Sequence, residues 1–315
     1  MRFMDFCAGI GGGRLGLEHN GLECVAHSEI DIITNKTYRL FFGEEEKNYG
    51  DLMCIDTTTL PNFDVLIGGF PCQTFSIVGK REGFADSRGQ IIYGLIRILV
   101  EKDVPYFILE NVKGLVNHNK GETLKAILEE LSNVGYYVDC RVLNSEDYGV
   151  PQLRERIYFV GIKKDLMKKS FQWPRPTPMP NIRDYLIDTD NDVLDKDNPT
   201  WQKYLNNKYN KGRFDLEELL KEDYLVLDWR QSDLRLYRGK TPTLRTGRHG
   251  ILYVKDGKLR KLSGYEGLLL QGFPKELADK AKNAKINNNK LLSQAGNAMT
   301  VSVISAIGRS LLECI

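Results

Sequence analysis

Short apolar runs alternate with segments of helical periodicity over residues 1 to about 165, and this alternation constrains the fold more than any other feature. Strands are predicted at Arg2–Cys7, Cys24–Ser28, Val65–Gly68, Tyr106–Glu110, Tyr137–Leu143 and Arg156–Ile162. Helical patterns fill the intervals, for example at Asp31–Phe42 and Thr123–Asn133. Strands that alternate with helices in this way build a parallel sheet covered by helices. We therefore predict an α/β fold with a doubly wound parallel sheet.

A proline-rich run divides the chain. The stretch from Trp173 to Pro180 contains four prolines, which cannot continue a helix or a central strand. The residues that follow, as far as Phe273, are polar and lack clear periodicity except at Phe214–Lys221. Amphipathic helical periodicity returns at Thr300–Ile315. We predict a first domain over 1–178, a smaller, mostly irregular or β domain over 179–273, and a segment over 274–315 that returns to the first domain.

The composition is that of an ordinary soluble protein. Of the 315 residues, 42% are hydrophobic and 27% are charged. No apolar run is long enough to span a bilayer, and the N-terminus lacks the pattern of a signal peptide. The 6 cysteines show no CxxC spacing, which fits a reducing compartment and argues against structural zinc. We expect a cytoplasmic protein with no membrane segment and no metal.

A glycine-rich turn follows the first predicted strand and consists of Ala8, Gly9, Ile10, Gly11 and Gly12. Glycines at a strand-to-helix turn let the backbone approach a ligand closely. The dinucleotide pattern GxGxxG would require Gly where Arg14 stands. Glu29 closes the second strand, where a carboxylate could bind ribose hydroxyls, and Asp51 could hold an adenine amino group. This order of features favours an adenosyl ligand without a pyrophosphate.

The segment Gly68-Gly69-Phe70-Pro71-Cys72-Gln73 places a cysteine just past the end of a predicted buried strand. In open α/β sheets, ligands bind outside the carboxyl ends of the strands. A lone cysteine at such a junction is more often an ordinary half-buried residue than a nucleophile. Cys72 is therefore a candidate nucleophile only in combination with the other motifs.

Positive charge is concentrated between Trp229 and Lys261. This stretch has ten Lys or Arg residues against two acids, although the net charge of the whole chain is only +2. Tyr237, His249 and Tyr253 are interleaved with the basic residues. A run of charge is usually a solvated surface, but basic residues mixed with Gly, Thr and aromatic side chains also suit a surface that contacts phosphates and bases.

Further short motifs occur in a characteristic order. They are Glu110-Asn111-Val112, Gln152-Leu153-Arg154-Glu155-Arg156, Arg260-Lys261-Leu262, Gln271-Gly272-Phe273-Pro274 and Gln294-Ala295-Gly296-Asn297-Ala298. With these motifs and the Pro-Cys segment, the chain resembles the DNA cytosine-C5 methyltransferases of bacterial restriction–modification systems. The resemblance runs from Arg2 to the C-terminal helix, except between Asn181 and Thr241. It implies a sheet of the S-adenosylmethionine-dependent methyltransferase type and a second, target-recognition domain.

The resemblance also implies a mechanism, because C5 of cytosine is a weak nucleophile that must be activated. Addition of the Cys72 thiolate at C6 builds an enamine. Positive charge from Arg154 and Arg156 would keep that thiolate available. Glu110 would supply a proton or hydrogen bond at N3. Asn111 would orient the catalytic loop, and Arg156 would bind the cytosine O2 and position Glu110.

The cofactor that the resemblance implies is S-adenosyl-L-methionine, with S-adenosyl-L-homocysteine as the product and no metal. Beyond the glycine turn, Glu29 and Asp51, the implied cofactor-binding residues are Ile30, Leu52, Phe70, Pro71, Ile91, Asn297 and Ala298. Two positions depart from the family, which usually has Phe where Cys7 stands and often has an aromatic residue where Ile30 stands. We therefore expect more aliphatic packing around the adenine.

Double-stranded DNA is the implied partner of a monomeric enzyme, and a cognate restriction endonuclease would act on the same site. The target cytosine must leave the stacked duplex, and the loop Thr74–Gly89 would close over it. We expect arginines between Trp229 and Gly250 to contact guanines, since Arg pairs with guanine O6 and N7. The expected DNA-binding residues are Lys80, Arg81, Arg88, Arg230, Arg235, Arg238, Thr243, Arg245 and Arg248.

Three alternatives remain beside this hypothesis. A tRNA cytosine-C5 methyltransferase on the same scaffold would carry a Cys-Phe-Thr tripeptide, which this sequence lacks. A DNA-binding regulator that binds S-adenosylmethionine but has lost activity would not need Cys72, Glu110, Arg154 and Arg156 together. A Rossmann dehydrogenase is disfavoured by Arg14.

Overall fold

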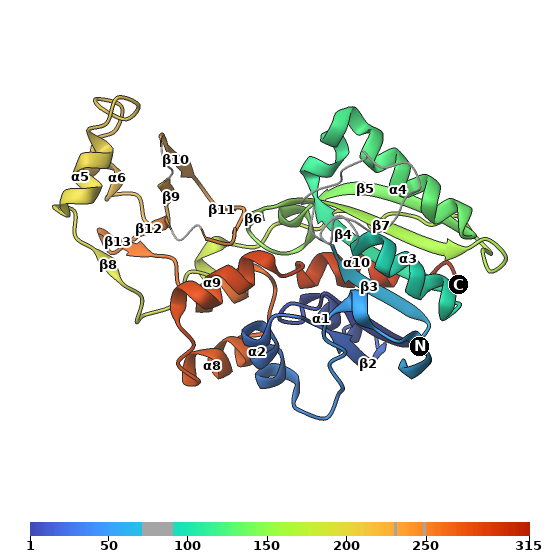
Figure 1. Ribbon diagram of the computed structural model, residues 1–315. Coiled ribbons are helices and arrows are strands. Elements are labelled where there is room, and N and C mark those ends of the chain that lie inside the picture. Colours follow the sequence, from blue (N-terminus) through green and yellow to red (C-terminus); the bar gives the residue numbers. More distant parts are fainter. Residues whose placement is uncertain (71–90, 230–231, 248–249) are drawn as a thin grey trace. The chain divides into compact units, whose positions relative to one another are not determined.

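The computed structural model describes residues 1–70, 91–229, 232–247 and 250–315 (Figure 1). These residues form two compact units. The first comprises Met1–Asn144, Glu155–Pro176 and Ala298–Ile315, and the second comprises Ser145–Arg154 and Thr177–Asn297. The division at Pro176 falls inside the proline run, and the residues from 274 to Asn297 group with the second unit. Within the described ranges, no helix has the length and apolar character needed to cross a membrane.

A six-stranded sheet forms the centre of the first unit. Its strands, in spatial order, are β2 (Glu23–Ser28), β1 (Arg2–Phe6), β3 (Val65–Gly69), β4 (Tyr106–Val112), β7 (Glu155–Lys163) and β5 (Tyr136–Asn144). Each corresponds to a predicted strand, and no strand end differs from its prediction by more than two residues. The predicted α/β class is confirmed.

The sheet is mixed, so the predicted parallel arrangement holds for four of its six strands. β2, β1, β3 and β4 run parallel, whereas β7 runs antiparallel to both of its neighbours, β4 and β5. Only Ser145–Arg154 separates β5 from β7, and this connection contains no crossover helix. A short connection can join only antiparallel neighbours, because a parallel return needs a long crossover.

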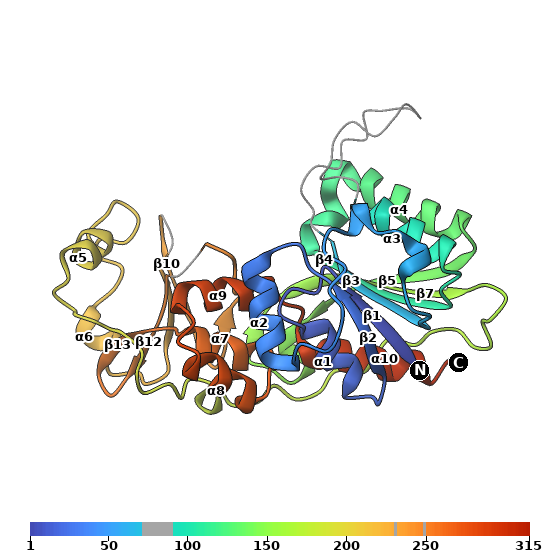
Figure 2. The same ribbon diagram turned by 60° about the horizontal axis from the view of Figure 1, so that its bottom comes forward.

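Helices cover both faces of this sheet (Figure 2). The helices α3 (Ile91–Glu101) and α4 (Glu122–Asn133) lie on one face, and α1 (Gly12–Glu18) and α10 (Val301–Leu312) lie on the other. Gly16 allows α1 and α10 to approach closely, because a Cβ atom there would lie 2.5 Å from Cβ of Ile304. The helix α2 (Ile32–Phe42) begins at Asp31, whose side chain accepts a hydrogen bond from the backbone N of Thr34 (2.6 Å). Short 3-10 helices are η1 (Leu52–Cys54), η2 (Thr57–Thr59), η3 (Lys113–Gly121), η4 (Ser145–Tyr148) and η5 (Ile182–Asp184).

The second unit has an antiparallel sheet. In spatial order its strands are β10 (Leu234–Tyr237), β9 (Val226–Trp229), β12 (Ile251–Lys255), β13 (Lys258–Lys261) and β8 (Val193–Leu194). A parallel pair is formed by β6 (Gln152–Leu153) and β11 (Thr241–Pro242). The helices are α5 (Pro199–Leu205), α6 (Leu216–Leu219), α7 (Gly264–Leu270), α8 (Lys275–Asn283) and α9 (Asn288–Asn297).

An aromatic cluster stabilises the second unit. The fully buried Trp201 stacks on Tyr204 with ring centroids 5.9 Å apart, and it meets Trp229 edge-on at 5.4 Å. Large aromatic side chains of this kind bury much apolar area per residue. The stretch that the sequence predicted as irregular or β therefore contains an antiparallel sheet with a hydrophobic core of its own.

Candidate active site

The carboxyl ends of β3 and β4 bring the first candidate residues together. The two strands pair in register, with Gly69 opposite Glu110. The backbone N of Phe70 donates to the Glu110 carbonyl (3.2 Å), and Nδ2 of Asn111 donates to the Phe70 carbonyl (2.9 Å). Asn111 is only 1% exposed. This buried amide therefore fixes the main chain of the residue directly before Pro71.

Glu110 forms an ion pair with Arg156. The register of β4 and β7 places Arg156 opposite Val112, two residues beyond Glu110. Nε of Arg156 lies 3.0 Å from Oε1 of Glu110, and the two side chains are 13% and 12% exposed. Charges shielded from water in this way attract each other more strongly than exposed ones. The pair holds the Glu110 carboxylate in a defined orientation.

Arg154 makes contacts that the sequence did not suggest. It lies in the second unit, is 2% exposed, and its Nη1 donates to the carbonyls of Leu244 and Gly296, both at 3.1 Å. Oε1 of Gln152 accepts from the backbone N of Leu244 (3.0 Å). Arg154 and Gln152 together bind both peptide groups of Leu244. Its described contacts therefore make Arg154 a residue that positions the segment around Leu244.

Three of the other cysteines, Cys7, Cys24 and Cys140, are poor sources of thiolate. Burial raises the pKa of the Cys7 thiol to about 12, and the nearby Glu29 and Asp5 act in the same direction. Burial also raises the pKa of Cys140 and of Cys24. Because the thiolate is the nucleophilic form, these environments suit structural thiols.

The predicted glycine turn connects β1 to α1. Gly9 has a φ of +58°, and no atom of the described residues lies within 4 Å of the place its Cβ would occupy. A Cβ at Gly12 would lie 2.3 Å from the carbonyl oxygen of Met299, so only glycine fits there. Cys7 itself has a positive φ of 51°, which is uncommon for a residue with a side chain. The turn is open at Gly9, where a ligand could approach the backbone closely.

Glu29 lies beside this turn. Its Oε2 accepts from the backbone N of Gly9 and its Oε1 from that of Asp31, both at 2.8 Å. Burial raises the pKa of Glu29, and the Asp31 and Gly9 donors partly oppose that shift. Asp51 begins η1, where its Oδ1 accepts from the backbone N of Met53 (2.9 Å). Each Glu29 oxygen keeps acceptor capacity for a further donor, because a carboxylate has about four lone-pair sites. These residues fit a nucleoside ligand.

The other residues expected around the cofactor differ in exposure. Leu52 and Phe70 are buried, and Ile91 is partly buried. Ile30 is 68% exposed, so its side chain is available to a ligand. Asn297 is exposed, and its Oδ1 accepts from Oγ1 of Thr246 in the second unit. The buried Ala298 begins the last segment of the first unit.

Several expected DNA-binding residues have protein partners. Both guanidinium nitrogens Nε and Nη2 of Arg238 bind the Glu222 carboxylate, at 2.7 and 2.9 Å, and Nε of Arg235 lies 3.1 Å from Asp233. Thr243 donates from Oγ1 to the Leu153 carbonyl (2.7 Å), and Arg245 is exposed. Exposed ion pairs contribute little to stability and can open when another partner binds.

Some predicted site residues lie outside the described ranges. They are Pro71, Cys72, Lys80, Arg81, Arg88, Arg230 and Arg248. Among the residues that the structure does describe, no group of three or more His, Cys, Asp or Glu residues could hold a metal ion.

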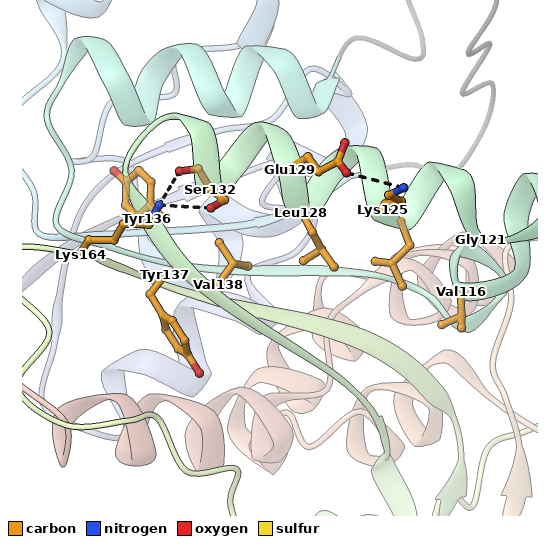
Figure 3. A pocket seen from close by; sticks show the side chains of 11 residues that line it. Val116, Gly121, Lys125, Leu128, Glu129, Ser132, Tyr136, Tyr137, Val138 and Lys164 are labelled. Carbon is orange, nitrogen blue, oxygen red and sulfur yellow. Dashed lines mark hydrogen bonds and ion pairs between the residues drawn. The ribbon is translucent and has the colours of Figure 1, made fainter.

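A groove of about 550 Å³ lies between η3, α4 and β5 (Figure 3). Its walls are formed mainly by apolar side chains such as Val116, Leu128 and Val138. Nζ of Lys164 donates to the Ser132 carbonyl (2.9 Å), and Lys125 lies 3.9 Å from Glu129. None of the predicted site residues lines this groove. Its lysines are paired with Ser132 and Glu129, and nothing among its lining residues corresponds to the predicted chemistry.

Comparison with known proteins identifies the class. The model of the C-5 cytosine-specific DNA methylase family matches residues 1–313. The chain belongs to this family, and its class is therefore that of enzymes that methylate cytosine at C5 in DNA. The predicted resemblance is confirmed.

Individual relatives agree with this assignment. The Type II methyltransferase M.BsuFI of Bacillus subtilis is 35% identical over 329 residues, which cover 99% of this chain and 73% of that protein. M.HhaI of Haemophilus parahaemolyticus, also a Type II methyltransferase, is 33% identical over 98% of this chain and 93% of its own length.

Solved structures show the same fold. A putative DNA modification methyltransferase from an E. coli prophage superposes with a TM-score of 0.73 at 20% identity, covering 100% of this chain and 99% of that one. The S. pombe Dnmt2 methyltransferase superposes with a TM-score of 0.72 at 20% identity, covering 99% and 98%. At this identity the likeness concerns the fold alone, and it does not favour the tRNA alternative.

Proposed function

We propose that this chain is a sequence-specific DNA cytosine-C5 methyltransferase that works through a covalent adduct of Cys72. The observation that carries the proposal is the pairing of Asn111 with the Phe70 carbonyl beside the ion pair of Glu110 and Arg156. The first contact anchors the main chain two residues before Cys72. The second provides a carboxyl and a guanidinium at the same strand ends, where open α/β sheets bind ligands.

The chemistry assigned to these residues proceeds in two stages. The Cys72 sulfur forms a bond to C6, and the ring electron pair moves toward C5 while Glu110 protonates or hydrogen-bonds N3. S-adenosylmethionine, when bound, would supply a methyl group on a sulfonium, which C5 attacks while S-adenosylhomocysteine leaves. A base then removes the C5 proton, the C6–S bond breaks to release the Cys72 thiolate, and a proton taken up at N3 returns to Glu110. Arg156 holds Glu110 throughout and contacts the cytosine O2.

The glycine turn, Glu29 and Asp51 are proposed to bind the adenosine part of the cofactor. The open space at Gly9 and the free acceptor sites of Glu29 support this assignment. Leu52 and the exposed Ile30 would pack against the adenine, and with Cys7 they would make the pocket more aliphatic than the family pattern. Phe70 is a further proposed contact. Pro71, Ile91, Asn297 and Ala298 remain proposed contacts.

One assay tests the proposed function against its alternatives. The protein is incubated with S-adenosylmethionine carrying a tritiated methyl group and either duplex DNA or tRNA. We expect label in duplex DNA and none in tRNA. Transfer to tRNA would favour the RNA enzyme, and absence of transfer to both would favour a silent regulator. Bisulfite sequencing of plasmid DNA from expressing cells would then identify the methylated site.

A Glu29→Ala variant is expected to bind S-adenosylmethionine much more weakly and DNA with unchanged affinity. The carboxylate should accept two ribose hydroxyls, and charge-assisted hydrogen bonds of this kind are worth roughly 1.5–3 kcal/mol each. Isothermal calorimetry measures the cofactor affinity, and a gel-shift assay measures the DNA affinity. Unchanged cofactor affinity would remove Glu29 from the site.

Target recognition is proposed to lie between Asn181 and Arg260, with base contacts concentrated in Trp229–Gly250. Arg pairs bidentately with guanine, and this segment offers Arg230, Arg235, Arg238, Arg245 and Arg248. Arg235 and Arg238 would exchange Asp233 and Glu222 for DNA. Two neighbouring residues of this segment are held in place. Thr243 donates to the Leu153 carbonyl, and the peptide groups of Leu244 are bound by Arg154 and Gln152. These contacts support a fixed recognition segment.

Transplanting residues 181–260 into M.HhaI is expected to carry the sequence specificity of this chain with it, because the base-contacting side chains lie in that segment. Bisulfite sequencing of DNA methylated by the chimaera reads the result directly, and the reciprocal exchange serves as the control. An active chimaera that keeps the specificity of its host would contradict the assignment.

The proposed partners follow from this function. Double-stranded DNA would be the substrate of a monomeric enzyme, and a cognate restriction endonuclease would cut the same sequence when it is unmethylated. Lys80, Arg81 and Arg88 would bind phosphates near the flipped cytosine. The enzyme would act in the cytoplasm, on the DNA of the cell.

A further inference from the structure

The segment Lys47–Gly50 runs beside the carboxyl end of β2 and is bonded to it along its length. The backbone N of His27 donates to the Lys47 carbonyl (3.3 Å), and the backbone N of Tyr49 donates to the His27 carbonyl (2.9 Å). Oγ of Ser28 donates to the Gly50 carbonyl (2.7 Å). The residues before Glu29 are therefore tied to the residues before Asp51.

The side chain of Asn48 completes this connection. Its Oδ1 accepts from the backbone N of Glu29 (3.0 Å) and of Gly50 (2.9 Å), and its Nδ2 donates to the Glu29 carbonyl (2.9 Å). One amide thus binds both peptide groups of the proposed ribose acid and the backbone N–H of Gly50, the residue before the proposed adenine acid. The Asn48 side chain therefore links the main chain of Glu29 to that of Gly50.

Packing constrains this turn from one side only. His27 and Ser28, which precede Glu29, are buried, whereas Ile30 and Asp31, which follow it, are exposed. Hydrogen bonds are therefore the contacts that hold the Glu29 main chain on its exposed side. Because the Glu29 carboxylate accepts from Gly9 and Asp31, a shift of its backbone would also turn its two oxygens away from the orientation that a ribose needs.

Arg14 anchors the same segment from the other side. Its guanidinium pairs with Glu46, two residues before Asn48, and with Glu18 at 2.8 Å. The guanidinium carbon also lies 4.1 Å from the centre of the Phe42 ring. Arg14 is largely buried among these partners. Arg14 thereby joins α1, which follows the glycine turn, to the loop that carries Asn48.

We propose that Asn48 is a positioning residue of the cofactor site, which sets the orientation of Glu29 and of the turn leading to Asp51. This inference rests on the proposed binding of S-adenosylmethionine by Glu29. Asn48 itself need not touch the cofactor. Its effect is on affinity, because it holds two ligand-binding carboxylates in one arrangement before the ligand arrives and so lowers the cost of ordering them.

The test is calorimetric titration of the full chain with S-adenosylhomocysteine, which binds without turnover. Asn48→Ala is compared with Glu29→Ala, with the double variant, and with Asp56→Ala. Asp56 provides a matched control, because its side chain makes similar bonds to Thr58 N (3.0 Å) and Thr58 Oγ1 (2.7 Å) in the same unit. All titrations are made well below the thermal midpoint of each variant, so that only folded protein is measured.

We expect Asn48→Ala to raise the dissociation constant about tenfold, the effect of losing about 1.4 kcal/mol of binding free energy. Asp56→Ala should change it less than about twofold, even if its thermal midpoint falls similarly. In the Glu29→Ala background, Asn48→Ala should cost less than about threefold, because residues that act through each other are not additive. Asn48→Asp keeps the Oδ1 acceptor, loses the donor to the Glu29 carbonyl and adds a negative charge there, so it should also weaken binding, and by less in the Glu29→Ala background.

The outcomes separate this inference from the function it rests on. If Asn48→Ala leaves the affinity unchanged while Glu29→Ala weakens it, the positioning role is wrong and the ribose assignment stands. An equal loss in the wild-type and Glu29→Ala backgrounds would also contradict the inference, because Asn48 would then act independently of Glu29. If Glu29→Ala has no effect, the ribose assignment itself fails. If Asn48→Ala does not fold, Asn48→Asp decides the question by the same comparison.

Discussion

A Cys72→Gly variant is expected to transfer no detectable methyl group to duplex DNA. Without a nucleophile that adds to C6, the ring has no enamine and C5 cannot attack a methyl sulfonium. Specific DNA binding should persist, because recognition is assigned to residues 181–260 and the smaller side chain leaves room for the flipped base. Tritium incorporation measures the first effect and a gel-shift assay on cognate and altered duplexes measures the second.

Cys140→Ala is the matched control for this loss. Cys140 is a partly buried thiol in the first unit whose pKa is raised by burial, so it should not act as a nucleophile. The control should retain the wild-type rate within about twofold, as expected of a small change away from the reacting groups. Methyl transfer by Cys72→Gly at a measurable fraction of the wild-type rate would refute the assigned nucleophile.

A Glu110→Gln variant is expected to lose roughly 10²–10⁴-fold in the rate of methyl transfer, the usual contribution of a positioned general acid. Glutamine has nearly the same shape but cannot deliver a proton to N3, and it cannot form the charge pair with Arg156. Affinity for S-adenosylhomocysteine should remain unchanged, since Glu110 is not assigned to the cofactor. Single-turnover kinetics with saturating DNA and cofactor isolate the chemical step.

Glu155→Gln is the control for Glu110→Gln. Glu155 also forms an ion pair, with Lys113 at 2.7 Å, but both side chains of this pair are substantially exposed. Its loss should leave the single-turnover rate near that of the wild type. A Glu110→Gln rate within tenfold of the wild-type rate would show that the carboxyl is not the proton donor.

Most of the first unit could be predicted from the sequence because its strands are largely apolar runs of five to nine residues. The direction of β7 could not, since a run such as Arg156–Ile162 has the same periodicity in a parallel and in an antiparallel strand. Only the short connection between β5 and β7, which leaves no room for a crossover helix, indicates the antiparallel direction. The strands of the second unit are short, two to five residues each, so their periodicity is weak. One signal was available there: Asp256-Gly257 has positive φ at both residues and joins β12 to β13 as a two-residue hairpin turn.

The candidate site was predictable where function imposes a residue type at a strand end. Glu110, Asn111 and Arg156 were predicted from such motifs, and in the fold Asn111 binds Phe70 and Arg156 pairs with Glu110. Arg154 binds Leu244, which lies 90 positions away in the sequence, and Arg238 binds Glu222, 16 positions away. No local sequence pattern reveals such contacts. Asn48 was not predicted at all, because an asparagine in a polar loop is common and its contacts with Glu29 arise only in the folded chain.

The most direct test of the account is covalent trapping on duplex DNA that carries 5-fluorocytosine at the target position. Fluorine at C5 blocks the proton loss that precedes elimination, so the C6–S bond should persist after methyl transfer. With wild-type protein and S-adenosylmethionine we expect an adduct that survives denaturation and maps to Cys72 by peptide mass spectrometry. No adduct should form without S-adenosylmethionine or with Cys72→Gly. An adduct that persists in Cys72→Gly and maps to Cys7 or Cys140, or the lack of any adduct with a wild-type enzyme that methylates ordinary DNA, would contradict the mechanism.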